Sequence, residues 1–335
     1  MRAYQIETMG DVSGLKQVEL PKPTAGPGEV VVQVRACSLN YRDLMIIRGH
    51  YNPKMEVPRI PLSDCSGEIV EVGPGVTNLE PGTRVTGCFM PGWQAGGCDI
   101  TAQQTALGCE AEGVLADYIT LPATGVVKIP DHLSFGEAAT LPCAAVTAWH
   151  AILSGKPVLP GHTVLLLGTG GVSIFALQFA KLAGAKVAIT SSSDDKLNFA
   201  QKLGADFTVN YRNDPDWDKT VLQWSGGAGV DHVVEVGGAG TLPQSIRAVR
   251  MSGHIALIGV LSGVGDFNPI SILMKSINVR GIYVGSRDMF QSMNKAISAH
   301  QLRPVIDRTF GFDEVPQAYE HLASQTHLGK IVIEL

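Results

Sequence analysis

The chain lacks several features that mark particular classes of protein. None of its six cysteines forms a CxxC pair, and a cytosolic chain keeps such thiols reduced. It has no block of basic residues and a formal net charge of −5, which argues against nucleic acid as a partner. No apolar run approaches the roughly 20 residues of a membrane span, and the N-terminus has no hydrophobic signal region. We therefore expect a cytoplasmic protein with neither a nucleic-acid nor a membrane partner.

The length and composition predict a globular protein of two domains. The chain has 335 residues, 45% of them apolar, which is enough for two separate cores. Its first third is rich in short β-type runs bounded by Gly and Pro, at residues 29–35, 67–72, 81–87 and 116–122. Runs at this spacing suggest a compact, barrel-like domain.

One segment of the first third, residues 88–113, has little periodicity. A loop of this length often lines or covers a site. The alternative is a surface insertion without a role, and the sequence favours neither interpretation.

From residue 131 onward, β-type runs alternate with helical patterns. The runs are residues 164–167, 186–190, 207–210, 232–236, 254–258 and 279–284. Six strands in such alternation predict a doubly wound parallel sheet, and hence an α/β fold. A last run, residues 329–335, is expected to rejoin the first domain. The predicted division is residues 131–284 for the parallel sheet, and residues 1–130 with 285–335 for the β-rich domain.

A glycine cluster at the first of these strands predicts a dinucleotide site. The run Val164–Leu167 leads into Gly168, Gly170 and Gly171, and an amphipathic segment follows directly. Glycine permits the sharp turn and the close approach of a pyrophosphate, and the following helix directs its free N–H groups at that phosphate. Ser173 stands where the common fingerprint has a third glycine. Serine is small enough for close packing of the helix on the strand, and it also adds a hydroxyl that can lie near the phosphates. The residues predicted to form this turn are Gly168, Thr169, Gly170, Gly171 and Val172.

The next strand predicts NADP(H) rather than NAD(H). An NAD site usually has an acid about 20 residues on, whereas residues 191–193 are all serine. A carboxylate would repel a 2′-phosphate, and hydroxyls donate to it. Asp194 and Asp195 argue the other way, although acids are favoured in the first turn of a helix anyway. The predicted contacts to this end of the cofactor are Ser191, Ser192, Lys196 and Tyr211.

Taken together, these pieces resemble the medium-chain dehydrogenase/reductase superfamily. The resemblance extends over nearly the whole chain and rests on five segments in a specific order. They are VRACSLNYRDL (34–44), PLSDCSGEIVEVGPGV (61–76), LPCAAVTAWHAI (141–152), GTGGVS (168–173) and GKIV (329–332). It implies a GroES-like β-domain joined to a Rossmann domain, and it is most similar to the zinc-free, quinone-oxidoreductase-like branch.

The same resemblance implies that no metal is bound. Zinc alcohol dehydrogenases of the superfamily take three ligands from positions that here match Asn40, Ser63 and Cys143. Asn and Ser are poor zinc ligands, and one thiolate does not make a tetrahedral site. The structural zinc of those enzymes needs four closely spaced cysteines, and the cysteines here lack that spacing.

Without a Lewis acid, a reaction that must stabilise an alkoxide becomes difficult. Hydride addition to an already polarised acceptor needs less stabilisation of negative charge. The expected activity is therefore NADPH-dependent, zinc-independent hydride transfer to a small-molecule quinone or α,β-unsaturated carbonyl. Two alternatives stay open. One is a zinc-independent NADP(H) alcohol dehydrogenase or carbonyl reductase, and the other is a non-catalytic NADPH-binding protein.

The resemblance also assigns the remaining site residues. Asn40 and Tyr41 are the expected catalytic residues, and Tyr41 is the expected donor to a carbonyl oxygen; a cleft-filling tyrosine is the alternative. Lys330 is expected to reach the cofactor, unless it is a solvated lysine. A homodimer is expected to form through the strand at residues 279–284. The further predicted cofactor contacts are Thr147, Val236, Gly237, Gly259, Val260, Val284, Gly285 and Ser286.

Overall fold

The computed structural model describes residues 1–259, 265 and 268–335, and their backbone contacts divide the chain into two compact units. Unit 1 comprises Met1–Val146 and Gly285–Leu335, and unit 2 comprises Thr147–Val284. The second junction coincides with the expected one. The first lies 16 residues beyond the expected residue 130, because the helix α3 (Phe135–Ala139) packs on three strands of unit 1, β3, β4 and β15.

Unit 1 is built on a mostly antiparallel sheet with the order β14-β15-β3-β4-β5-β7, in which β6 also pairs with β3. A separate two-stranded sheet joins β1 and β2. The bounds are β1 Arg2–Ile6, β2 Leu15–Glu19, β3 Glu29–Leu39, β4 Asp64–Val72, β5 Arg84–Gly87, β6 Tyr118–Pro122, β7 Val126–Lys128, β14 Ile306–Gly311 and β15 Lys330–Glu334. All four strands predicted in the first third are present, with bounds that differ by a few residues.

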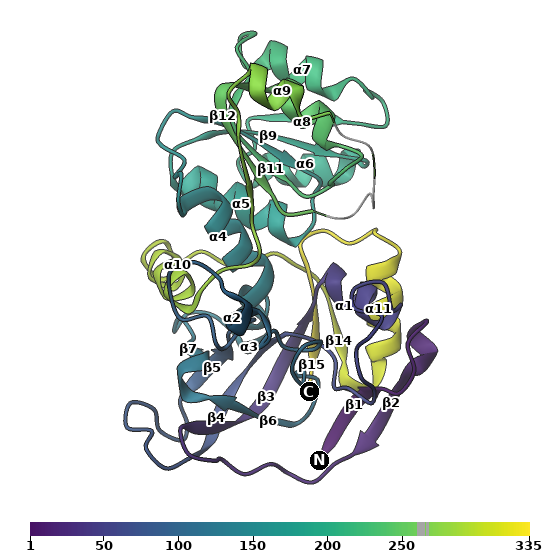
Figure 1. The fold of residues 1–335 in the computed structure, drawn as a ribbon, viewed down its shortest axis with the longest axis vertical. Helices are drawn as coiled ribbons and strands as arrows, with labels where there is room; N and C mark the ends of the chain where they lie inside the picture. The colour runs from purple at the N-terminus through teal and green to yellow at the C-terminus, as the bar shows by residue number, and fades with distance from the viewer. Residues whose placement is uncertain (260–264, 266–267) are drawn as a thin grey trace. The chain divides into compact units, whose positions relative to one another are not determined.

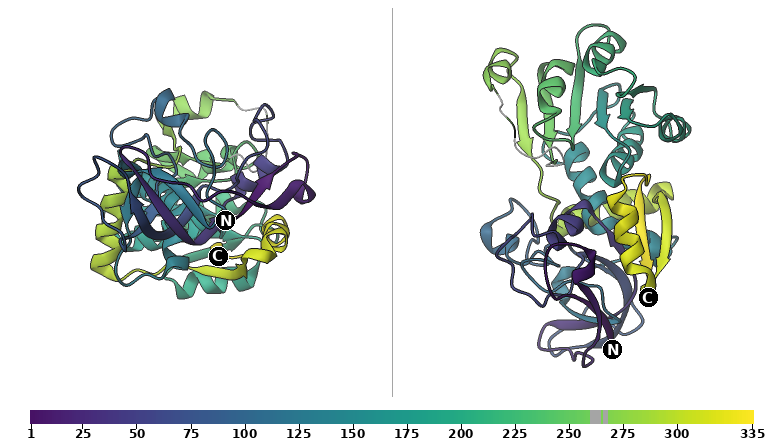
Figure 2. Two further views of the ribbon diagram at one scale, coloured as in Figure 1. Left: turned by 90° about the horizontal axis from the view of Figure 1, so that it is seen from below. Right: turned by 90° about the vertical axis from the view of Figure 1, so that its right-hand side faces the viewer.

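The C-terminal strand rejoins unit 1, as expected. β15 pairs antiparallel with β3, where Ile331 lies opposite Leu39, and β3 pairs with β4, where Ser38 lies opposite Asp64. In Figures 1 and 2 the C-terminal segment (yellow) lies beside the N-terminal strands (purple). This register brings the start of β15, the end of β3 and the start of β4 to one end of the sheet.

The helices of unit 1 cover the sheet and close its core. They are α1 Tyr41–Ile47, α2 Ile100–Gln103, α3, α10 Arg287–His300 and α11 Val315–Ala323. The core includes residues of β3, α1 and α11, among them the fully buried Ile47 and Tyr319. The sequence of residues 134–150 is helix-like but interrupted by Pro142, and the structure has the interruption there. A π-helical turn at Leu141–Ala145, which contains Pro142, separates α3 from α4 (Val146–Leu153). Proline has no N–H for the regular helical ladder, which explains the interruption.

Unit 2 is a doubly wound Rossmann sheet of six parallel strands in the order β10-β9-β8-β11-β12-β13. The bounds are β8 Thr163–Leu167, β9 Lys186–Ser191, β10 Phe207–Asn210, β11 Val230–Glu235, β12 Val249–Leu257 and β13 Asn278–Gly281. All six predicted strands are present. β13 ends three residues earlier than expected, because its partner β12 ends at Leu257, opposite Gly281.

Five further helices belong to unit 2, namely α5 Gly171–Leu182, α6 Asp194–Lys202, α7 Trp217–Trp224, α8 Leu242–Ala248 and α9 Ile270–Met274. α7 and α8 pack together and share a core with sheet residues such as Leu165 and Val233. The order of the strands reverses between β8 and β11, and ligands of such sheets bind at that switch point. Within the described part of the chain, no helix is long and apolar enough to cross a membrane.

Candidate active site

The glycine turn between β8 and α5 has the geometry of a phosphate site. Gly168 adopts a φ of +70°, which glycine tolerates and other residues rarely adopt. Its N–H donates to Thr190 Oγ1 at 3.3 Å, and α5 begins at Gly171 with Gly170 as its N-cap. A Cβ built on Gly168 or Gly170 would meet no protein atom within 4 Å. The turn therefore leaves open space at a helix N-terminus, and a pyrophosphate fits there.

Two residues of this turn face inward. Ser173 is buried, and its hydroxyl donates to the carbonyl of Leu167 at 2.6 Å. Of the two roles expected for Ser173, the structure therefore shows the close packing of α5 on β8, and the hydroxyl holds these two elements together instead of serving the phosphates. Thr169 is also buried, and its Oγ1 lies 3.2 Å from Ser191 Oγ. Val172, the second residue of α5, is partly exposed.

The serine run after β9 divides into an inner and an outer part. Ser191 is 3% exposed and bonded to Thr169, so its hydroxyl belongs to the interior of unit 2. Ser192 and Lys196 are partly exposed, and Tyr211 is 42% exposed just beyond β10. Asp194 Oδ1 accepts a hydrogen bond from Asn210 Nδ2 at 2.6 Å. Of the four predicted contacts to a 2′-phosphate, three thus lie at the surface of the unit.

The ends of β11 and β12 approach each other closely. Val236 and Gly237 follow β11, and Gly259 follows β12. A Cβ on Gly259 would lie 1.6 Å from the carbonyl oxygen of Val236, so that only glycine fits there. A Cβ on Gly237 would lie 2.2 Å from Thr241 Oγ1. The predicted contact Val260 lies outside the described residues.

A buried carboxylate, which the sequence analysis did not identify, holds the turn after β11. Glu235 is completely buried and accepts hydrogen bonds from the N–H groups of Gly237 at 2.8 Å and Gly238 at 3.0 Å. Thr241 Oγ1 donates to it at 2.6 Å, and the hydroxyl of Ser245 donates as well. Four donors satisfy the charge and fix the backbone where the sheet binds ligands. The signal in the sequence was an acid between an apolar strand and two glycines.

The last predicted cofactor contact of unit 2 is a strained residue. Val284 has a φ of +53°, an outlier for a β-branched side chain. Its carbonyl accepts a hydrogen bond of 2.7 Å from Nδ1 of His150, whose other nitrogen accepts from Arg280 at 3.1 Å. Burial lowers the pKa of His150, which agrees with a neutral ring. Thr147, the second residue of α4, is buried.

Gly285 and Ser286 belong to unit 1 and are buried there. A Cβ on Gly285 would lie 2.6 Å from Val146 Cγ1. Ser286 is the N-cap of α10, and its hydroxyl accepts from the N–H of Met289 at 3.2 Å. The hydroxyl thus has a structural role in the helix start.

The start of α1 holds the two predicted catalytic residues. Asn40 is the N-cap, and Tyr41 is the first residue of the helix and partly exposed. Asp43 is buried, and its Oδ2 accepts from the N–H of Asn40 at 2.7 Å. Burial raises the pKa of Asp43 to about 7, against the opposing effect of the neighbouring Arg42. The N–H of Asn40 at the start of the helix is thus held by a buried carboxyl whose pKa is raised to about 7.

Lys330 lies inside unit 1 instead of at its surface. Its side chain is 3% exposed, and its Nζ donates to the carbonyl of Leu39 at 2.7 Å and to Asn40 Oδ1 at 2.6 Å. Nζ also lies 3.8 Å from Oδ2 of the fully buried Asp64. An ammonium donates only, so this bond fixes which end of the Asn40 amide faces the lysine. Lys330 was expected at the cofactor, and the structure gives its ammonium three partners within unit 1.

Asp64 connects the remaining residues of this group. Its Oδ1 accepts from Ser63 Oγ at 2.9 Å, and its Oδ2 accepts from the N–H of Cys143 at 3.3 Å. Burial raises the pKa of Asp64, and the charge of Lys330 and the hydrogen bonds oppose that rise. We call Asn40, Ser63, Asp64, Cys143 and Lys330 the Lys330–Asp64 cluster.

The cluster does not fit a zinc ion, although the resemblance places the zinc ligands of related enzymes at Asn40, Ser63 and Cys143. Asn40 Oδ1 is bonded to an ammonium, and Ser63 donates to Asp64. Burial and the carboxylate of Asp64 raise the pKa of the Cys143 thiol, which opposes the thiolate that zinc requires. Among the described residues, no group of three His, Cys, Asp or Glu side chains is placed to hold a metal.

The segment 88–113 is held to α1 by one buried arginine. Arg42 donates to the carbonyl of Leu107 at 2.8 Å and to Glu110 Oε2 at 3.1 Å. Its guanidinium also lies over the ring of Phe89, 4.7 Å from the centroid. Arg42 directly follows Tyr41, so the loop is tied to the turn of helix that carries a predicted catalytic residue.

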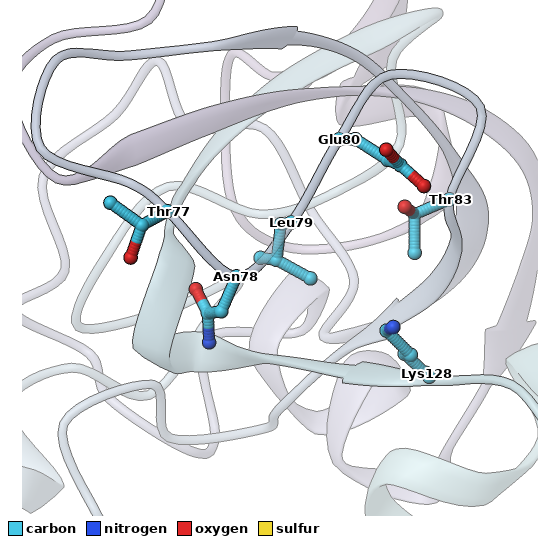
Figure 3. A pocket seen from close by; sticks show the side chains of 6 residues that line it. All are labelled: Thr77, Asn78, Leu79, Glu80, Thr83 and Lys128. Atoms are coloured by element: carbon cyan, nitrogen blue, oxygen red, sulfur yellow. The ribbon is translucent and has the colours of Figure 1, made fainter.

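Two surface hollows of unit 1 contain none of the predicted residues. One is lined by Asp131, His132, Ser298 and Gln301. Figure 3 shows the other, where Lys128 of β7 faces the turn that carries Thr77, Asn78, Leu79, Glu80 and Thr83. Lys128 is exposed, so this hollow offers no buried charged group to a ligand.

Comparison with known proteins supports the same fold. Residues 26–131 match a family model described as the alcohol dehydrogenase GroES-like domain, and residues 171–299 match one described as zinc-binding dehydrogenase. A zinc-type alcohol dehydrogenase-like protein of Schizosaccharomyces pombe is 45% identical, with 97% of each chain covered. A solved NAD-dependent alcohol dehydrogenase is 34% identical with a TM-score of 0.92, and 100% of each chain is covered. The quinone oxidoreductase of Coxiella burnetii is 26% identical with a TM-score of 0.82, covering 100% of this chain and 99% of that one.

The two family models, the relative and the solved structures agree with the Rossmann sheet of unit 2 and the GroES-like fold of unit 1. The chain therefore belongs to the medium-chain dehydrogenase/reductase superfamily and is an NAD(P)H-dependent oxidoreductase of that family.

Proposed function

We propose that the protein transfers hydride from NADPH to a quinone or an α,β-unsaturated carbonyl, without zinc. The observation that carries this proposal is the Lys330–Asp64 cluster. At the three positions that match zinc ligands it has an amide, a hydroxyl and a thiol of raised pKa, together with a buried ammonium. Acceptors that delocalise negative charge into an enolate or a quinol anion need no metal for that purpose.

In this proposal, one set of residues binds the cofactor and another orients the acceptor. The N–H groups at the start of α5 bind the pyrophosphate, and the backbone after β11, β12 and β13 lies along the nicotinamide half. Glu235 keeps the first of these backbone turns rigid. NADPH, when bound, supplies the hydride. Tyr41 donates a hydrogen bond to the carbonyl oxygen of the acceptor, where negative charge develops.

The preference for NADPH is proposed from the surface of unit 2 beside β9. No acid occupies the position that accepts from a ribose 2′-hydroxyl, and Ser192, Lys196 and Tyr211 supply two hydroxyls and a cation. Asp194, the first acid after the three serines in the sequence, accepts a hydrogen bond from Asn210. The similar solved enzyme that is NAD-dependent points the other way, so both cofactors belong in the assay.

The names of the relatives favour a second candidate, a zinc-independent alcohol dehydrogenase or carbonyl reductase. The yeast relative is zinc-type alcohol dehydrogenase-like, and the solved neighbour of TM-score 0.92 is an alcohol dehydrogenase. This alternative shares the fold and the cofactor site and differs in the acceptor.

A panel assay separates these candidates. Oxidation of NADPH and NADH is followed with quinones, 2-alkenals, ketones and aldehydes, and reduction of NADP⁺ and NAD⁺ with alcohols, after treatment with a chelator. The proposal expects turnover of quinones or alkenals, none of simple alcohols, and a higher kcat/KM with NADPH. Turnover of alcohols alone establishes the second candidate. Equal efficiency with NADH refutes the cofactor preference, and tight NADPH binding without turnover indicates a binding protein.

A further inference from the structure

Two side chains of unit 2 hold the backbone just beyond β13. Nδ1 of His150 lies 2.7 Å from the carbonyl oxygen of Val284, and Nη2 of Arg280 lies 3.1 Å from Nε2 of the same ring. His150 and Val284 are 4% and 5% exposed. The two contacts therefore join α4, which carries His150, to β13 and to the segment that leaves it.

These two contacts fix the tautomer of the His150 ring. A guanidinium only donates hydrogen bonds, so Nε2 of the ring accepts from Arg280 and carries no proton. A neutral ring then has its proton on Nδ1, the nitrogen that faces the carbonyl of Val284. Burial lowers the pKa of His150, against the hydrogen bond to Val284, and the charge of Arg280 lowers it further. The ring is thus held neutral, with its single donor directed at Val284.

Arg280 is itself held in place by the chain after α4. Its Nη1 donates to the carbonyl of Ser154 at 3.4 Å. Gly155 has a φ of +84°, and a Cβ at this position would lie 1.9 Å from Nη1 of Arg280. The guanidinium therefore occupies a space that exists because residue 155 is glycine.

Val284 adopts a conformation that needs such support. Its φ of +53° is rare for a β-branched residue, and a strained residue of this kind persists where the surrounding structure holds it. Val284 lies three residues beyond Gly281, the last residue of β13. It is therefore at the carboxyl ends of the parallel strands, where sheets of this type bind their ligands.

We infer that His150, oriented by Arg280, is a positioning residue for the nicotinamide half of the cofactor, and that it acts by holding the peptide of Val284 in its strained conformation. The inference rests on the part of the proposed function that places this half of the cofactor along the backbone after β13. It does not depend on which acceptor is reduced.

The inference is tested by comparing two ligands in His150→Leu, which removes the donor and keeps an apolar side chain. One ligand is NADPH, and the other is 2′-phospho-ADP-ribose, the fragment of NADPH without nicotinamide. NADH and ADP-ribose take their place if wild type binds NADH more tightly. We expect the Kd for the dinucleotide, measured by calorimetric titration, to rise about tenfold or more, because the buried carbonyl of Val284 loses its hydrogen bond. The Kd for the fragment should stay within about twofold of wild type, since it ends before the nicotinamide.

Two further variants separate positioning from simple packing. In His150→Asn the amide nitrogen is bonded to Cγ, as Nδ1 is, so it can still donate to Val284, and the Kd for the dinucleotide should return to within about threefold of wild type. Arg280→Met keeps the ring and removes the donor that fixes its tautomer. We expect it to raise the same Kd by about threefold, again without effect on the fragment.

His254→Leu is the matched control. His254 is also buried in unit 2, and its Nδ1 lies 2.8 Å from Oδ1 of Asn278, at the opposite end of β13 from Val284. This variant should lose stability in urea unfolding and leave both Kd values unchanged.

The inference is overturned if His150→Leu raises both Kd values equally or neither, if His150→Asn binds the dinucleotide no better than His150→Leu, or if His254→Leu shows the same selective loss. Thermal unfolding shows which variants are folded. Should His150→Leu not fold, Arg280→Met decides the question, and an unchanged Kd for the dinucleotide then overturns the inference.

The inference and the proposed function fail separately, because the binding measurements need no acceptor. If wild-type protein reduces no quinone or alkenal, the proposed function is wrong, while the two Kd values still decide what His150 does. If the acceptor panel succeeds and His150→Leu weakens binding of both ligands equally, only the inference is wrong.

Discussion

At the scale of single residues, the site is governed by ionisable groups withdrawn from water. Asp43, Asp64 and Lys330 are all nearly or fully buried in unit 1, and Glu235 is fully buried in unit 2. Glu235 is satisfied by four donors, whereas Asp43 has one hydrogen bond to Oδ2, and its Oδ1 is buried without a hydrogen bond. For Asp43, burial with so few hydrogen-bond donors raises the pKa of the carboxyl.

The raised pKa of Asp43 predicts a specific dependence of stability on pH. Its pKa is about 7 in the folded protein, against 3.8 without the fold. Between these values the folded state binds a proton that the unfolded chain does not, so the contribution of Asp43 to the free energy of unfolding falls as pH rises from about 4 to 7. In Asp43→Asn the side chain stays neutral. The variant should therefore gain stability relative to wild type over that range, by up to about 4 kcal/mol.

Urea unfolding of both proteins at several pH values between 4 and 7 measures this difference. An amide still accepts the hydrogen bond from Asn40, so the start of α1 is retained. A difference in unfolding free energy that is constant over this pH range would show that Asp43 titrates normally.

At the scale of elements, the β8–turn–α5 unit is the part of the site that local sequence determines most fully. Apolar periodicity predicted the strand and the helix, and the conformational freedom of the three glycines predicted the turn. What local sequence did not show is that Ser173 turns inward to Leu167 and that Ser191 turns inward to Thr169. The direction of each serine depends on the part of unit 2 that packs against it, and local sequence does not show that packing.

We predict that Gly168→Ala weakens NADPH binding by about tenfold or more. Its φ of +70° strains an alanine, and the new methyl group enters the open space above the turn. Gly75→Ala is the matched control, since Gly75 has a φ of +85°, equally open surroundings and a place in unit 1. Both variants should lose about 1–2 kcal/mol of stability, and only Gly168→Ala should change the Kd. Equal Kd values for the two variants would contradict a phosphate site at this turn.

At the scale of the whole molecule, the sheet of unit 2 ends at β13, which among the described strands pairs only with β12. α9, just before β13 in the chain, carries Ile270, Leu273 and Met274 with 58%, 75% and 71% of their surfaces exposed. An edge strand beside exposed apolar side chains favours association. We propose that two copies pair at this edge, as the sequence analysis expected.

The prediction is that wild-type protein sediments as a dimer and that Leu273→Glu weakens or abolishes the dimer, because a charge would be buried at the interface. Ile100→Glu is the matched control, since Ile100 is 68% exposed on α2 of unit 1. It should leave the dimer intact. Analytical ultracentrifugation decides the matter; a monomeric wild type, or a dimer unaffected by Leu273→Glu, would contradict it.

The sequence by itself determined the two-unit fold, the six parallel strands and the glycine turn between β8 and α5. These follow from periodicity and glycine placement, which act over short stretches of chain. It also determined that Asn40 and Ser63 are poor metal ligands, since that depends on residue type alone.

Only the tertiary structure decided what Lys330, Glu235 and Arg42 do. Lys330 and Asn40 are 290 residues apart in the chain, and the register of β15 against β3 brings them together. No local pattern carries that register, because it is set by the packing of strands from both ends of the chain. For the same reason, the exact start of unit 2 depends on where α3 packs, which its own sequence does not specify.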